Sequence, residues 1–308
     1  MILHHTFSHL PCLPERQASR EGRLTIPVRW LLQVGLFSAF LMLLSHTSAD
    51  AFRVNVSPSK IDPGDAFTIM ISGAETSEAP NAFMGGKRVL LASCGDSCFI
   101  GIGAVDISTR PGIYKIEVHI GEKKVSRNLS VNRGRFPTKF LTLPEGKVFL
   151  SPEDSQRAER EQEKLDTIWS TLTDRLWEGN FVFPLKNIIS TSFGVKRIMN
   201  RKKTSVHKGI DIKGKEGDEV KAANRGKVVL AEELFFGGNT VVLDHGQGIY
   251  TIYMHLSAFK VKQAETIQKG AVIGHVGSSG RSSGPHLHFG VKVMQVSANP
   301  ASLVKLKL

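Results

Sequence analysis

The hydrophobic pattern of residues 52–132 predicts short β-strands. Apolar and polar residues alternate in several segments, as expected where one face of a strand is buried. Turn-forming residues separate the segments, among them Pro63-Gly64-Asp65 and Arg110-Pro111-Gly112. The predicted strands are residues 52–56, 66–71, 99–105, 114–120 and 125–131. Strands of this length and spacing favour a small β-sandwich, which we assign to residues 52–135 with a binding or spacing role, since no polar cluster there resembles a site.

A helix is predicted after the sandwich. Ser151-Pro152-Glu153-Asp154 provides an N-cap residue, a proline at the first helical position and acidic residues in the first turn. Apolar residues then recur at three- and four-residue spacing, as on one face of a helix. They are Leu165, Ile168, Trp169, Leu172 and Leu176. We predict a helix over about 152–178, ended by Gly179-Asn180, within a linker of residues 136–180.

Residues 181–308 are rich in Gly and β-branched residues and predict a second β-rich domain. Its expected strands include residues 228–230, 240–243, 250–253 and 286–293. The predicted fold class is therefore mainly β, with an N-terminal β-sandwich-like domain, a connecting helix and a C-terminal β-rich domain.

Residues 1–51 have the layout of a secretory signal peptide. Residues 30–44 are an uncharged apolar run, four Arg residues precede it, and Ala49-Asp50-Ala51 offers a small-residue cleavage site. A membrane-spanning helix needs about 20 apolar residues, so an uncleaved signal anchor is the alternative. We expect an exported protein.

Charge and cysteine usage agree with export. The formal net charge is +12, from 40 Lys and Arg against 28 Asp and Glu, which favours an anionic partner. Export and the lack of a Lys/Arg-rich block argue against nucleic acid. Cys12 lies in the predicted signal peptide, and Cys94 and Cys98 are close enough to form a small disulfide. Two free thiols are the alternative.

Two short fragments suggest a metal site. His286 and His288 lie at i and i+2, on the same side of a predicted strand. His207 and Asp211 lie upstream beside Gly209, at a strand end or bulge. Each match is weak alone. Together the two fragments offer three histidines and one aspartate. Two of these histidines with the aspartate would give three ligands, the number that leaves a catalytic zinc one position for water. The chain is therefore a candidate hydrolase.

Further motifs surround these fragments in a fixed order. They are Phe183-Pro184-Leu185, Ser192-Phe193-Gly194 with Arg197, 207–211, 217–220, 223–228, 253–256, Lys269-Gly270, Ile273-Gly274 and 284–289. With this order, residues 183–300 resemble the lysostaphin-like (LytM-type) zinc metallopeptidases, which cut peptidoglycan peptides. Members of the family often have Glu after the final Phe, where this chain has Gly290. That difference affects a supporting contact and no direct ligand.

The resemblance implies a zinc metallopeptidase domain over residues 181–308. It implies that His207, Asp211 and His288 bind one Zn²⁺ per chain, and that His255 and His286 flank the metal as catalytic histidines. No H-E-x-x-H helix supplies a glutamate base, so a neutral imidazole must orient or deprotonate the water. Which of the two histidines does so stays open.

Four further residues are candidates for lining the substrate groove. They are Arg197, Asn239, Tyr250 and His245. Each has an ordinary structural alternative, namely a salt bridge for Arg197 and a strand-end or turn position for His245.

The expected function is an exported zinc endopeptidase that hydrolyses peptidoglycan stem or cross-bridge peptides. Peptidoglycan is the expected partner, and a membrane is one only if the leader is retained. The expected location is a Gram-negative periplasm, with inner-membrane anchoring or secretion as alternatives. The competing hypothesis is a non-catalytic LytM-type regulator that activates a separate amidase. An autoinhibitory upstream region is a further hypothesis. A purely structural zinc would require a fourth protein ligand, for which the sequence offers no candidate.

Overall fold

The structure is a computed structural model that describes residues 52–308 apart from residues 75, 77 and 143. The predicted signal peptide lies outside these residues. The described residues belong to one compact unit. Among the described residues, no helix combines the length and the apolar character needed to cross a membrane.

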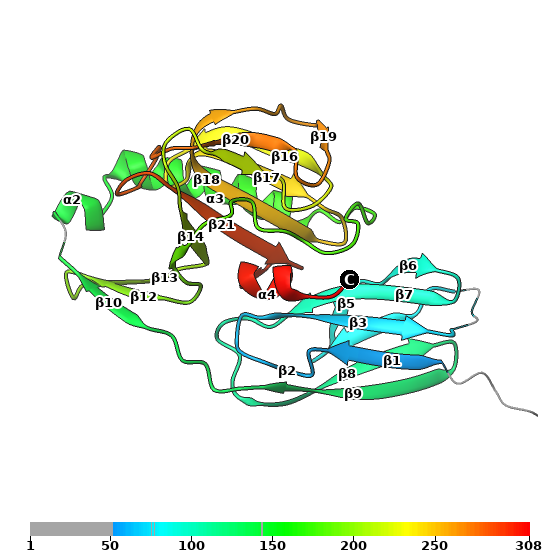
Figure 1. Ribbon diagram of the computed structural model, residues 1–308. Coiled ribbons are helices and arrows are strands. Elements are labelled where there is room, and N and C mark those ends of the chain that lie inside the picture. The colour runs from blue at the N-terminus through cyan, green and yellow to red at the C-terminus, as the bar shows by residue number, and fades with distance from the viewer. Residues whose placement is uncertain (1–51, 75, 77, 143) are drawn as a thin grey trace, which may run out of the picture. The chain divides into compact units, whose positions relative to one another are not determined.

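The first part of the described chain is a β-sandwich (Figure 1). One sheet has the order β1 (Arg53–Ser57), β3 (Ala66–Ser72), β7 (Cys98–Ala104) and β6 (Ala92–Gly95). The other has the order β2 (Lys60–Ile61), β9 (Lys123–Val131), β8 (Gly112–Ile120), β4 (Asn81–Met84) and β5 (Lys87–Val89). Side chains from both sheets form one apolar core, which includes Ile69, Ile71, Ile116 and Leu129. A disulfide joins Cys94 and Cys98 across the turn between β6 and β7.

A small sheet joins the region predicted as linker to the C-terminal domain. Strand β10 (Thr138–Leu141) pairs in parallel with β12 (Lys196–Met199), which pairs with β13 (Lys203–Val206). A one-turn helix, α2 (Glu145–Val148), separates β10 from the main helix.

The main helix, α3 (Pro152–Ser170), begins as predicted but ends early. The Ser151 side chain caps it by accepting a hydrogen bond from the Asp154 amide. The predicted end at 178 is wrong because β-branched Thr171 and Thr173 weaken the helix and the chain after Ser170 finds other partners. The Thr173 hydroxyl donates to Asp244, and its carbonyl accepts from the Gln247 amide. These bonds hold residues 171–177 extended along the neighbouring strand ends.

The C-terminal part is built on a ten-stranded sheet. The main strand order is β11 (Ile189–Thr191), β14 (Gly209–Lys213), β21 (His286–Val293), β18 (Ile249–Phe259), β17 (Gly238–Asp244), β16 (Gly226–Leu234) and β19 (Thr266–Ile267). Strand β20 (Val272–Val276) pairs with β15 (Glu219–Lys221) and β18, and β22 (Val296–Ala298) pairs with β21. A short helix, α4 (Pro300–Lys305), was not predicted. The predicted fold class is confirmed, because the structure is mostly strands with one long connecting helix.

Helix α3 packs on this sheet through a buried tryptophan, which leads to a first prediction. Trp169 is 5% exposed and meets the Tyr250 ring edge-on at a centroid distance of 5.3 Å. Trp169→Ala should lower the free energy of unfolding by about 3–5 kcal/mol, because truncating a buried tryptophan removes apolar contacts and leaves a cavity. Leu172→Ala is the control, since Leu172 is 55% exposed and such changes cost about 0.5 kcal/mol or less. Urea unfolding measures both; equal midpoints would contradict the packing described.

Candidate active site

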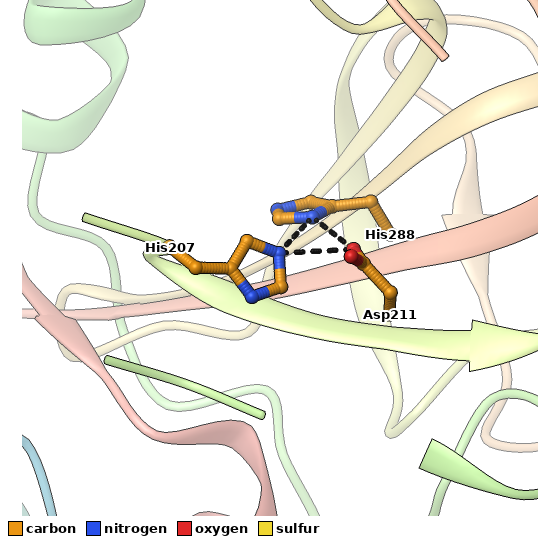
Figure 2. Close-up of side chains that lie close together, drawn as sticks. All are labelled: His207, Asp211 and His288. Carbon is orange, nitrogen blue, oxygen red and sulfur yellow. Dashed lines mark hydrogen bonds and ion pairs between the residues drawn. The ribbon is translucent and has the colours of Figure 1, made fainter. Parts of the chain in front are cut away.

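Two neighbouring strands and the loop before one of them bring His207, Asp211 and His288 together (Figure 2). Asp211 lies on β14 and His288 on β21, and the two are direct partners in the antiparallel register. His207 lies two residues before β14. All three side chains point to one place, where one ligand atom of each lies within 4.8 Å of the others.

The three polar atoms are arranged as they would be around a cation. His207 Nε2 is 2.9 Å from Asp211 Oδ1 and 3.0 Å from His288 Nδ1, which is 2.9 Å from the same oxygen. His207 Nδ1 is 2.9 Å from the Ser192 carbonyl and must donate to it, so Nε2 of a neutral His207 is an acceptor. His207 Nε2 and Asp211 Oδ1 are then two acceptors 2.9 Å apart, which repel each other unless a proton or a cation lies between them. Tetrahedral zinc, with bonds of about 2.0–2.1 Å, sets its ligands about 3.3 Å apart, so the side chains fit a zinc ion.

Asp211 is held in the ionised form that a metal ligand needs. Burial opposes its ionisation, but His207 and His288, when their rings carry a proton toward Oδ1, outweigh burial and hold the pKa of Asp211 far below the ordinary value. The second oxygen, Oδ2, pairs with the Arg197 guanidinium at 3.3 Å. Arg197 therefore forms a salt bridge with a proposed ligand, which was the alternative to its role in substrate binding. The other oxygen, Oδ1, faces the two histidines.

Gly209 makes room for His288. A methyl group at this position would come within 2.7 Å of His288 Nε2 and 2.6 Å of the Phe289 carbonyl oxygen. Its backbone is ordinary strand, and no positive φ is recorded for it. The glycine in this motif is therefore required by the close approach of the imidazole, not by a turn.

His255 reaches the site from an irregular part of β18. Its φ is +65°, which is unusual for a residue other than glycine, and the pairing of β18 with β17 shifts register just there. Its Nδ1 lies 2.9 Å from the Ser279 carbonyl and donates to it, so Nε2 is left to accept a proton. Burial lowers the pKa of His255 to about 4. The imidazole is thus neutral at physiological pH.

His286 lies beside His255, and in both residues Nδ1 is bonded to a backbone carbonyl. The two ring centroids are 4.8 Å apart. His286 Nδ1 donates to the Gly284 carbonyl at 2.8 Å, and Nε2 lies 3.7 Å from Asp211 Oδ1. The structure therefore places two imidazoles, each with an available Nε2, next to the three candidate ligands.

The other predicted groove residues divide into two groups. Asn239 lies near His255, where its side-chain amide donates to the Leu256 carbonyl at 3.0 Å. His245 and Tyr250 are 0% and 1% exposed, so the prediction that they contact substrate is wrong. His245 bonds the Arg225 carbonyl and the Thr251 hydroxyl, and the Tyr250 hydroxyl donates to the Thr171 carbonyl. Both residues are therefore part of the buried core, where their polar groups are hydrogen-bonded.

Sequence reasoning missed the groups that orient the histidines. They are the backbone carbonyls of Ser192, Ser279 and Gly284. Every residue has a backbone carbonyl, so the sequence does not show which carbonyls serve this role. The only available signal was that Ser192 precedes Phe193-Gly194 and that Ser279 and Gly284 shortly precede His286.

The fold and the site define a β-rich domain with a His-Asp-His cluster that could hold a metal ion, and the comparisons name the family of this domain. Residues 205–300 match the model of peptidase family M23. A Pseudomonas aeruginosa protein assigned to peptidase M23 has a crystal structure with a TM-score of 0.61 and 29% identity, covering 79% of this chain and 94% of that one. Residues 205–300 therefore form a peptidase M23 domain of the LytM type.

Two curated relatives carry names of endopeptidases, one of which is named for peptidoglycan. The DD-carboxypeptidase/endopeptidase Mpg of Neisseria meningitidis is 37% identical over 115 residues, which are 37% of this chain and 26% of that protein. The peptidoglycan DD-endopeptidase ShyA of Vibrio cholerae is 28% identical over 170 residues, which are 55% of this chain and 35% of that protein. The chain thus spans about a quarter to a third of the length of these relatives.

Buried His245 predicts an acid-sensitive fold. Burial lowers its pKa from 6.5 to about 4, so between these values the unfolded chain binds a proton that the folded chain does not. Stability should therefore fall as the pH falls through this window, by up to about 1.4 kcal/mol per pH unit from this residue. His245→Gln keeps a donor and an acceptor but does not titrate. Unfolding free energies at pH 4.5–8 should show a shallower acid loss for the variant; parallel curves would contradict the assignment.

Proposed function

We propose that this protein is an exported, zinc-dependent endopeptidase that hydrolyses peptide bonds in peptidoglycan. The observation that carries the proposal is the convergence of His207 Nε2, Asp211 Oδ1 and His288 Nδ1 within 3.0 Å of one another. Two further imidazoles, His255 and His286, lie beside them, each with its Nδ1 bonded to a backbone carbonyl. Three ligands plus adjacent bases are the composition of a catalytic site rather than of a closed structural one.

The chain's own residues divide the work in a simple way. His207, Asp211 and His288 would hold the ion, which supplies Lewis acidity that polarises a carbonyl and acidifies water. His255 enters the reaction neutral, because burial keeps its pKa low, and its Nε2 can accept a proton. His286 Nε2 can bond the developing oxyanion once protonated. The two carbonyls that hold the Nδ1 atoms keep both rings in these orientations.

Peptidoglycan is the proposed substrate because one of the named relatives is a peptidoglycan DD-endopeptidase and because the charge of the chain suits this polymer. The relatives described above are named as DD-endopeptidases or a DD-carboxypeptidase/endopeptidase. The net charge of +12 falls only to +10 without residues 1–49, which hold four Arg and two Glu, and this basic excess attracts a carboxylate-rich polymer. With the predicted signal peptide, these properties support a periplasmic enzyme, and we propose the peptide cross-links as the bonds cut.

The metal can be tested without measuring activity. Purified protein should bind one zinc ion per chain, and His207→Ala and His288→Ala should each abolish stoichiometric binding, because two ligands do not make a zinc site. His119→Ala is the matched control, since this histidine lies on β8 of the sandwich. Metal analysis after dialysis measures the stoichiometry. Full zinc content in both ligand variants would reject the site.

The reaction can be tested on purified peptidoglycan. Digestion by the zinc-loaded protein should release new amine ends from cross-linked peptides, and chelation should stop it until zinc is restored. His255→Ala and His286→Ala should each lower the rate about 10²–10⁴-fold, the usual contribution of a proton-transfer group, with zinc retained. Mass spectrometry of the products identifies the bond. Bound zinc without hydrolysis of any peptide would favour the regulatory alternative instead.

A further inference from the structure

Helix α3 lies outside the residues that match the peptidase family, yet it is tied to one turn of the peptidase domain. The helix contacts β16 (Figure 1). At the turn between β16 and β17, Glu161 Oε2 accepts a hydrogen bond from the Phe235 amide at 2.7 Å. Glu161 Oε1 accepts from Arg157 Nε at 2.8 Å. One glutamate thus connects the helix to the backbone of the turn.

Glu161 is less exposed to solvent than the charged side chains around it. Its side chain is 19% exposed, against 44% for Arg157. One turn further along the helix, Lys164 pairs with Glu232 at 2.6 Å, but these side chains are 51% and 39% exposed. Exposed ion pairs contribute little, whereas a carboxylate that accepts a backbone N–H in a sheltered place forms a strong bond. Glu161 therefore constrains the turn more than the neighbouring pair does.

The turn leads directly to His255. The Gly237 carbonyl, two residues after Phe235, accepts from the His255 amide at 2.7 Å. This bond supports His255 at its positive φ, a conformation that needs outside support in a residue other than glycine.

A second route runs through the loop that orients the His255 ring. The Phe236 carbonyl accepts from the Arg281 amide at 3.0 Å. Gly238 and Gly280 pack so closely that a methyl group on Gly280 would lie 2.2 Å from the Gly238 nitrogen. The loop of residues 279–281, which these contacts hold against the turn, supplies the Ser279 carbonyl that accepts a hydrogen bond from His255 Nδ1. The backbone and the ring of His255 are thus both bonded to elements that the turn holds.

We propose that Glu161 is a positioning residue for His255, by which helix α3 becomes part of the catalytic apparatus. The proposal rests on the proposed function, in which His255 exchanges a proton. Loss of the Glu161 bond frees the turn at residues 235–238 and relaxes both supports of the imidazole. Small displacements of a catalytic group have large rate effects, about 10²-fold for 1 Å.

The experiment compares three variants of the full zinc-loaded chain. Glu161→Ala removes the acceptor, Glu161→Gln retains an oxygen that can accept from the Phe235 amide, and Lys164→Ala removes the exposed pair as a control. Glu161→Ala should lower kcat about 10–100-fold on a soluble cross-linked peptidoglycan fragment, with KM within about twofold. Glu161→Gln should recover most of kcat, and Lys164→Ala should match the wild type. Zinc content and Tm are measured for each.

Hydrogen exchange makes the test independent of activity. The His255 amide should exchange faster in Glu161→Ala than in the wild type, and at the wild-type rate in Lys164→Ala. Unchanged exchange in Glu161→Ala overturns the proposal, as does faster exchange with wild-type kcat. A kcat loss that is explained by lost zinc, or shared by Lys164→Ala, also overturns it. An inactive wild type would reject the proposed function, while exchange would still decide whether Glu161 supports His255.

Discussion

The pairing of β14 with β21 is the constraint on which the site depends. Ile210, Ile212, Leu287 and Phe289 are at most 1% exposed and alternate along these strands. Because side chains alternate between the two faces of a strand, burying these residues turns the ligand positions to the other face. A slip of one residue would exchange the two sets. The core therefore sets the register, and the register places Asp211 opposite His288.

His255 follows a different rule, because regular strand geometry does not place it. The bulge and the positive φ turn its ring toward the site at a cost of order 1–3 kcal/mol. Contacts from Gly237 and Ser279 offset that cost. The core of the sheet thus positions the ligands, whereas loops position the proposed base, His255. For this reason a change in helix α3 should affect His255 more than the ligands.

Much of this could be predicted from the sequence, because the information is local. Strand alternation and the N-cap at Ser151 depend on neighbouring residues, and the ordered motifs around His207 and His288 identify the family. The end of α3 could not be predicted, since residues 171–177 leave the helix for partners more than 70 residues away, such as Asp244. His245, a candidate groove residue, proved to be a core residue whose ring bonds the backbone carbonyl of Arg225, 20 residues away. Long-range bonds to backbone groups leave no pattern in a sequence.

The central claim is that His207, Asp211 and His288 form an open zinc site. Zinc-edge X-ray absorption of the zinc-loaded protein tests it most directly. The account predicts four nitrogen or oxygen ligands at about 2.0–2.1 Å, with the scattering signature of two imidazoles and no sulfur. Sulfur at about 2.3 Å, a third imidazole in place of the open position, or six-fold coordination would contradict it.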